Sequence, residues 1–187
     1  ILTSNKLNIT MPAVFINSPF MLHISNFVIN HPETCVNISY SDCPHDIIGE
    51  SFDVAFRIGE LPDSSFKAKH IFAFSRKVVA NRDFLNRYAP LKHPRDLVKV
   101  PWIGLTMRPH SRTFKHASGE QFDIKYVPQI RVDNVEASYR LAKQCVGLAA
   151  PPEYLVRSDL DRGEIEWVLP DWRLDPLKVH AIWPSNI

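Results

Sequence analysis

The sequence predicts an α/β protein whose sheets are mixed and mainly parallel. Runs typical of short strands alternate with helical patterns along the whole chain. Hydrophobic residues make up 45% of the sequence and charged residues 22%, as in folded globular domains. A length of 187 residues suffices for one domain or two small lobes. The alternation itself indicates strands joined by helices.

The first third of the chain predicts a strand, a helix and two further strands. Leu7–Met11 alternates apolar and polar residues and ends at Pro12, as a strand would. Ser18 followed by Pro19 predicts a helix start, because a hydroxyl can cap a helix and proline fits its first position. The helix is expected to end at Pro32. Strands are expected over 36–40 and 53–58, with a helical turn over 45–50 between them.

From Phe66 onward the strands are expected to be longer and the connections more varied. Ser118-Gly119-Glu120 predicts a hairpin whose second arm runs over 122–132. Asn134 is expected to cap a helix, and a second helix should open after Pro152 and stop at Gly163. The expected strands are 66–74, 76–80, 101–105, 146–150, 165–169 and 177–183, with short helices near 83–88 and 94–98.

Composition excludes several classes of function for these residues. The sequence has 22 Lys and Arg residues and 20 Asp and Glu residues, so its net charge is +2. This charge is too small for nucleic-acid binding unless the cations are clustered on one face. Only 6 residues are glycine, and no glycine-rich phosphate loop occurs. No apolar run approaches the roughly 18 residues of a membrane span, and the start lacks a secretory signal pattern. A membrane partner is therefore not expected.

Candidate catalytic and metal-binding residues are scattered. The eight histidines form no HExxH pattern, and no nucleophile elbow is present, so we expect no metal, no cofactor and no enzyme. Cys35, Cys43 and Cys145 have no CxxC spacing, which favours a reducing cytoplasm, although Cys35 and Cys43 could meet across a turn.

Arg57 stands out as a charge in an otherwise apolar strand that ends at Gly59. The carboxyl end of a central strand is where ligand sites form in open α/β sheets. Arg57 could therefore meet a ligand, or it could pair with Glu60 or Asp63. The sequence favours neither reading.

The order of several segments resembles the effector-binding domain of LysR-type transcriptional regulators. The resemblance is closest over Phe52–Ser65 (FDVAFRIGELPDSS) and Val146–Val156 (VGLAAPPEYLV). It continues through Ala68–Ile71, Gly163–Trp172 and Pro176–Pro184, so five segments match in register. Any one of them is weak evidence, but together they cover essentially the whole chain.

The resemblance implies a two-lobed fold of the type 2 periplasmic binding proteins. Lobe I would comprise residues 1–75 and 176–187, and lobe II residues 76–175. A small-molecule effector would bind between the lobes. The family's winged helix-turn-helix would be absent from this fragment, so DNA would be bound only through that missing domain.

The same resemblance assigns ligand-binding residues by position. In lobe I these are Met11, Pro12, Ala13, Phe15, Ser41, Asp42, Arg57, Ile58 and Gly59. In lobe II these are Gly104, Leu105, Thr106, Asn134 and Pro151. Their apolar character suggests a small or partly apolar effector, with Arg57 meeting a carboxylate if it has one.

The resemblance also implies a homodimer, and a higher oligomer of the full-length protein. Helix 18–30 of one copy would pack against helix 134–144 of the other, with strand 35–40 alongside. RNA polymerase is a further partner to consider for the whole regulator. The alternative from another class is a free-standing solute receptor of the same fold, which would be a secreted monomer.

Cys145 departs from the family pattern, which has glycine at this helix end. Cysteine lacks the backbone freedom of glycine in the left-handed region. Either an inert buried thiol or a redox-sensing one is compatible with the sequence, and the first reading is favoured.

Overall fold

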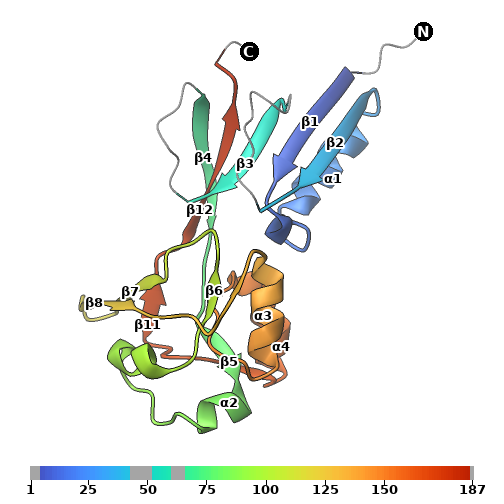
Figure 1. Cartoon of the computed structure of the whole chain (residues 1–187). Coiled ribbons are helices and arrows are strands. Elements are labelled where there is room, and N and C mark those ends of the chain that lie inside the picture. Colours follow the sequence, from blue (N-terminus) through green and yellow to red (C-terminus); the bar gives the residue numbers. More distant parts are fainter. Residues whose placement is uncertain (1–4, 43–51, 60–65, 186–187) are drawn as a thin grey trace. The chain divides into compact units, whose positions relative to one another are not determined.

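The computed structural model describes residues 5–42, 52–59 and 66–185 (Figure 1). The chain forms two compact units: Ile1–Ala73 with Leu177–Ile187, and Phe74–Pro176. We call them unit 1 and unit 2. Assigning them to lobes I and II with the boundaries above stays a prediction.

Unit 1 contains a five-stranded mixed sheet in the order β2-β1-β3-β12-β4 (Figure 1). Strand β1 pairs in parallel with both β2 and β3, while β12 pairs antiparallel with β3. The chain enters the sheet through β1, turns through the short 3-10 helix η1, and returns along helix α1. The elements are β1 (Asn5–Met11), η1 (Ala13–Phe15), α1 (Met21–Asn30), β2 (Thr34–Tyr40), β3 (Val54–Ile58), β4 (Lys67–Phe74) and β12 (Leu177–Trp183).

The expected helix start at Ser18 and Pro19 is wrong. Helix α1 begins at Met21, and no side chain caps its N-terminus. The hydroxyl of Ser18 instead donates backwards to the carbonyl of Phe15 at 2.9 Å. A Ser hydroxyl can either cap the following helix or bond a carbonyl of the preceding turn, and the Ser18 hydroxyl bonds the turn at η1. The helical turn expected over 45–50 lies outside the described residues.

An aromatic cluster holds the turn between β1 and α1 in place. Phe15 is fully buried and meets Phe20 edge-on, with ring centroids 5.5 Å apart. Phe56 of β3 and Phe72 of β4 lie 6.3 Å from the Phe15 ring. This packing fixes the position of the loop that follows β1, where several predicted ligand-binding residues lie.

Unit 2 has a layer of short strands flanked by helices and a separate three-stranded antiparallel sheet, β11-β7-β8. In the layer, β10 pairs antiparallel with β5, and β6 pairs in parallel with β9. Leu148 and Ala149 bridge the two pairs, because Leu148 pairs with Trp102 and Ala149 with Val79. The elements are β5 (Val79–Asn81), α2 (Arg82–Asn86), η2 (Pro94–Lys99), β6 (Ile103–Leu105), β7 (Ser111–His116), β8 (Gln121–Lys125), β9 (Ile130–Val132), α3 (Val135–Lys143), α4 (Glu153–Asp161), β10 (Ile165–Trp167) and β11 (Trp172–Leu174).

The hairpin at Gly119 is confirmed, but its second arm is not one strand over 122–132. Strand β8 ends at Lys125, and β9 belongs to a different sheet. Pro128 between them has no backbone N–H to continue a ladder. Gln129 donates its N–H to the carbonyl of Trp102 at 3.0 Å, which starts the pairing with β6. Strand β11 was not expected from the sequence.

The core of unit 2 is built around Trp102, which is 1% exposed. Its indole N–H donates to the carbonyl of Leu97 at 2.9 Å, so the buried ring has no unmet polar group. Tyr126 stacks on it with centroids 4.3 Å apart and planes 17° apart. Phe84, Phe114 and other side chains complete the cluster. None of the described helices is long and apolar enough to cross a membrane.

Candidate functional site

The carboxyl ends of β1 and β2 bring together most of the predicted ligand-binding residues of unit 1. Met11 is in register with Tyr40, and Ser41 donates its N–H to the carbonyl of Met11 at 2.9 Å. The N–H of Ala13 donates to Asp42 Oδ1 at 3.0 Å. Residues 11–13 and 41–42, far apart in sequence, thus form one edge of the sheet.

Not every side chain in this group is available to a ligand. Met11 and Phe15 are fully buried, so they shape the loop from inside. Pro12, Ala13, Ser41 and Asp42 are half-buried, and these can present atoms to a small molecule.

Arg57, Ile58 and Gly59 lie at the end of β3, the neighbour of β1 on the side away from β2. Arg57 is in register with His180 of β12, and its Nη1 donates to the carbonyl of Phe56 at 2.9 Å. Gly59 has φ 98°, a region that favours glycine, and its N–H donates to the carbonyl of Lys178 at 2.9 Å. Glu60 and Asp63 lie outside the described residues, so a salt bridge with either stays an open alternative for Arg57.

In unit 2 the predicted residues gather at the carboxyl ends of β6 and β9. Thr106 donates its N–H to the carbonyl of Val132 at 2.9 Å, which places it next to the start of α3. Asn134 caps that helix as predicted, accepting from the N–H of Ala137 at 2.9 Å. Pro151 is buried, and its carbonyl accepts from the N–H of Lys77 at 3.3 Å. Residues 104–106 and Asn134 are therefore adjacent, whereas the hydrogen bond of Pro151 joins it to Lys77.

Sequence reasoning missed a group of arginines in unit 2. Arg76, Arg108 and Arg112 interact electrostatically with one another, although Arg76 lies far from the other two in the sequence. Burial, followed by the charges of Arg112 and Arg108, lowers the pKa of Arg76 to about 10, against the opposing effects of Asp175 and Tyr126. Burial likewise lowers the pKa of Arg108 and Arg112. No linear motif joins these positions, so only the fold could reveal them.

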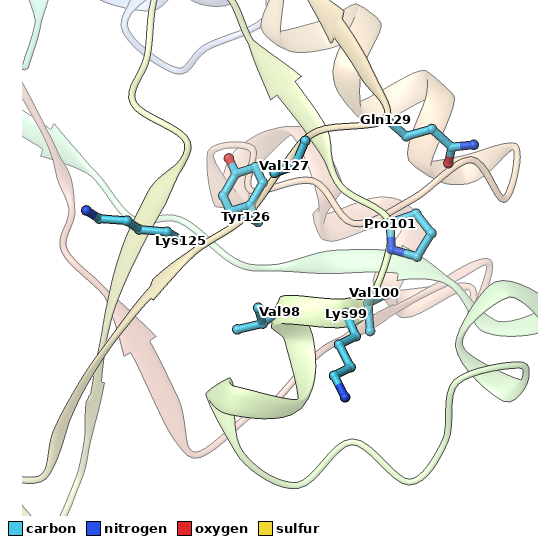
Figure 2. Close-up of a pocket in the computed structure, with 8 residues that line it drawn as sticks. All are labelled: Val98, Lys99, Val100, Pro101, Lys125, Tyr126, Val127 and Gln129. Atoms are coloured by element: carbon cyan, nitrogen blue, oxygen red, sulfur yellow. The ribbon is translucent and has the colours of Figure 1, made fainter.

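A separate surface pocket of about 390 Å³ lies between η2 and the segment after β8 (Figure 2). Lys99 and Lys125 supply cations, and Val127 is 87% exposed. This pocket includes none of the predicted ligand-binding residues. The lining residues are Val98, Lys99, Val100, Pro101, Lys125, Tyr126, Val127 and Gln129. Among the described residues, no three His, Cys, Asp or Glu side chains are grouped to hold a metal ion.

Comparison with known proteins identifies relatives of the whole chain. The family model for the LysR substrate binding domain matches residues 2–186. The regulator PtxR of Pseudomonas aeruginosa is 30% identical over 184 residues, which cover 97% of this chain and 59% of PtxR. The transcriptional activator AaeR of Escherichia coli is 28% identical over 158 residues, or 83% of this chain and 51% of AaeR. The chain thus spans between half and three fifths of the length of these two relatives.

Solved structures show the same fold. The regulatory domain of CrgA, a LysR-type transcriptional regulator from Neisseria meningitidis, has a TM-score of 0.80 at 20% identity, covering 98% of this chain and 90% of that one. The full-length virulence activator AphB of Vibrio cholerae has a TM-score of 0.80 at 19% identity, covering 98% of this chain and 63% of AphB. The curated relatives carry names of transcriptional regulators, not of enzymes.

Proposed function

The chain belongs to the LysR substrate binding domain family, and from this membership we propose that it senses a small-molecule effector for a DNA-binding transcriptional regulator. DNA would be contacted by a winged helix-turn-helix elsewhere in the full-length protein, with RNA polymerase as a further partner. A regulator works beside its DNA, so the proposed location is the cytoplasm. Catalysis is not part of this proposal, and turnover of a bound metabolite would contradict it.

The observation that carries the proposal is the convergence of backbone groups at strand ends. In unit 1, β1 and β2 end together, and the Ala13 N–H binds Asp42 there. In unit 2, β6 and β9 end together at Thr106 and Asn134. Ligands of open α/β sheets bind at such carboxyl ends. The proposed ligand-binding set is Met11, Pro12, Ala13, Phe15, Ser41, Asp42, Arg57, Ile58, Gly59, Gly104, Leu105, Thr106, Asn134 and Pro151.

We also propose that the chain dimerises through α1 and the neighbouring edge strand β2. None of the described side chains of α1 is buried, and Leu22 and Ile29 are 68% and 73% exposed. A helix normally buries an apolar stripe, so this one has apolar surface left for a partner. The family resemblance names the partner as a second copy and places the second copy's α3 against it.

A ligand controls such a regulator only if it binds two conformations with different affinity. The proposal therefore requires both binding and a change of state in the dimer. A free-standing solute receptor requires binding alone, by a monomer. The oligomeric state in solution therefore distinguishes a dimeric regulator domain from a monomeric solute receptor.

The experiment is a thermal-shift screen of the wild-type domain against a few hundred metabolites, with and without reductant. A ligand present at 100 times its dissociation constant adds about 2.7 kcal/mol of stability, which is several degrees for a domain of this size. Hits should weaken in Arg57→Ala but not in the matched control Arg173→Ala, whose side chain is exposed on β11. Equal affinity of a carboxylate effector for both variants would remove Arg57 from the site. If no metabolite raises the unfolding temperature of the wild-type domain, the sensing function is contradicted.

A further inference from the structure

Arg76, Arg108 and Arg112 lie beside predicted ligand-binding residues of unit 2. The N–H of Arg108 donates to the carbonyl of Leu105 at 3.2 Å in the turn that follows β6. Arg112 follows on β7, and Arg76 pairs with Pro152 in an isolated bridge. Arg76 and the segment 108–112 therefore converge near the end of β6.

Two polar side chains complete the group, which we call the arginine cluster: Arg76, Arg108, His110, Arg112 and Tyr126. Tyr126 donates its backbone N–H to the carbonyl of His110 at 3.0 Å, and the two rings lie 5.8 Å apart. The charges of Arg112 and Arg76 both act on the hydroxyl of Tyr126. The guanidinium of Arg112 lies 5.4 Å from the Tyr126 ring centroid, within range of a cation–π contact.

Three buried polar atoms of the cluster have no hydrogen-bond partner within the described part of the chain. They are His110 Nε2, Arg112 Nε and the Tyr126 hydroxyl. Tyr126 is 5% exposed, so solvent does not readily supply a partner. Buried polar groups in folded proteins are almost always hydrogen-bonded. Each of these atoms can donate a hydrogen bond, and together they suit an acceptor-rich group.

The positive charges of Arg76 and Arg112 are only partly balanced by carboxylates. Within residues 5–42, 52–59 and 66–185, no carboxylate forms a salt bridge with Arg76 or Arg112. Arg76 Nε and Nη2 bond the backbone carbonyl of Asp175, at 3.0 and 2.7 Å, while the Asp175 carboxylate pairs with Lys115 Nζ at 2.7 Å. Arg112 Nη1 bonds the carbonyls of Pro109 and Ser111. Its orientation is thus fixed by neutral groups, which leave its charge uncompensated.

We propose that the arginine cluster binds an oxyanion, a carboxylate or a phosphate group, of a small ligand. Guanidinium forks match the geometry of both groups and bind them through paired, charge-assisted hydrogen bonds. An oxyanion would accept from Arg112 Nε and the Tyr126 hydroxyl at once. The inference rests on the proposed sensing function and names the chemical class of its effector.

The test is isothermal titration calorimetry of the wild-type domain with sodium citrate and, in a second arm, inorganic phosphate. Sodium chloride of equal ionic strength serves as the reference, so that screening by salt is held constant. Tighter binding in one arm identifies the carboxylate or the phosphate as the preferred group. The variants are Arg112→Met and Arg108→Met, with Arg173→Met as the matched control, and circular dichroism verifies that each is folded.

We expect saturable binding that weakens at least tenfold in Arg112→Met and Arg108→Met and is unchanged in Arg173→Met. Arg112→Lys keeps the charge without the fork, so its affinity should be intermediate. Absence of saturable binding, or equal affinity in all variants, would overturn the proposal. A metabolite that binds the wild type and Arg112→Met equally would also overturn it, while leaving the sensing function intact. Anion binding through the arginines without any responding metabolite would instead contradict the sensing function alone.

Discussion

Gly104 lies directly against His110. A Cβ built at position 104 would come within 3.0 Å of His110 Nε2 and 2.8 Å of the Pro128 Cβ. The missing side chain on β6 is therefore what allows the imidazole, one of the three unpartnered groups of the arginine cluster, to lie close to the strand end.

Replacing Gly104 with alanine should destabilise unit 2. The Pro128 ring cannot rotate away, so the added methyl group forces the backbone or the His110 ring to shift. Overpacking of this kind costs about 1–3 kcal/mol. Urea denaturation measures the free energy of unfolding. The control is Gly119→Asn, because position 119 has φ 94° and no atom within 4 Å of a built Cβ, and asparagine tolerates that conformation. A Gly104→Ala domain as stable as the control would contradict the close contact.

Exposed apolar residues of α1 should govern self-association. Val28 is 42% exposed, so Val28→Asp should separate the proposed dimer without lowering the stability of the monomer. Val127→Asp makes the same change at an 87% exposed position in unit 2, outside the proposed interface, and should leave the dimer intact. Sedimentation velocity over a range of protein concentrations distinguishes the variants, and circular dichroism checks their fold. Dimers of equal strength in both would place the interface elsewhere.

The family resemblance identified position 145 as a glycine site, and the backbone there adopts the left-handed conformation that glycine favours. Cys145 has φ 62° at the end of α3, in the left-handed region. Side chains with a Cβ adopt this region at a cost of about 1–2 kcal/mol. Cys145→Gly and Cys145→Ala both remove the thiol, so their difference isolates the backbone effect. Thermal unfolding should show the glycine variant to be more stable than the alanine variant by about 1 kcal/mol. Equal stabilities would mean that the αL conformation carries no strain.

The sequence predicted elements well where a single local pattern decided the outcome. Asn134 caps α3, and Gly119 marks the β7–β8 turn, because both depend on neighbouring backbone groups. The prediction was wrong at Ser18, because its hydroxyl could bond either the preceding turn or the following helix. The prediction was also wrong after Lys125, where the chain passes from one sheet to another. The arginine cluster was beyond sequence reasoning. Arg76 and Arg112 are 36 residues apart in the sequence, and only the fold of unit 2 brings their side chains together.

Asp159 should make the stability of unit 2 depend on acid pH. It is 7% exposed and accepts from the Tyr139 hydroxyl, while Lys143 Nζ lies 2.8 Å from its Oδ2 and Arg162 pairs with its other oxygen. Burial opposes ionisation, but the hydrogen bonds from Lys143 and Tyr139 and the charges of Lys143 and Arg162 outweigh it, so the pKa lies below its ordinary value. The ionised form therefore stabilises the fold above the unfolded pKa of about 3.9, and this contribution disappears as the pH falls through the folded pKa.

Asp159→Asn removes the charge but keeps the shape of the side chain. It should lower the free energy of unfolding at pH 7 by about 1–3 kcal/mol, because Tyr139 and Lys143 lose a charged acceptor. The matched control is Asp161→Asn, an exposed carboxylate on the same helix, which should stay close to wild type. Urea denaturation from pH 7 to pH 3 should show the gap between wild type and Asp159→Asn narrowing below about pH 4, where the Asp159 carboxylate of the unfolded chain begins to take up a proton while that of the folded chain is still ionised. A gap that stays constant across this range would show that Asp159 stabilises unit 2 by packing and not by its charge.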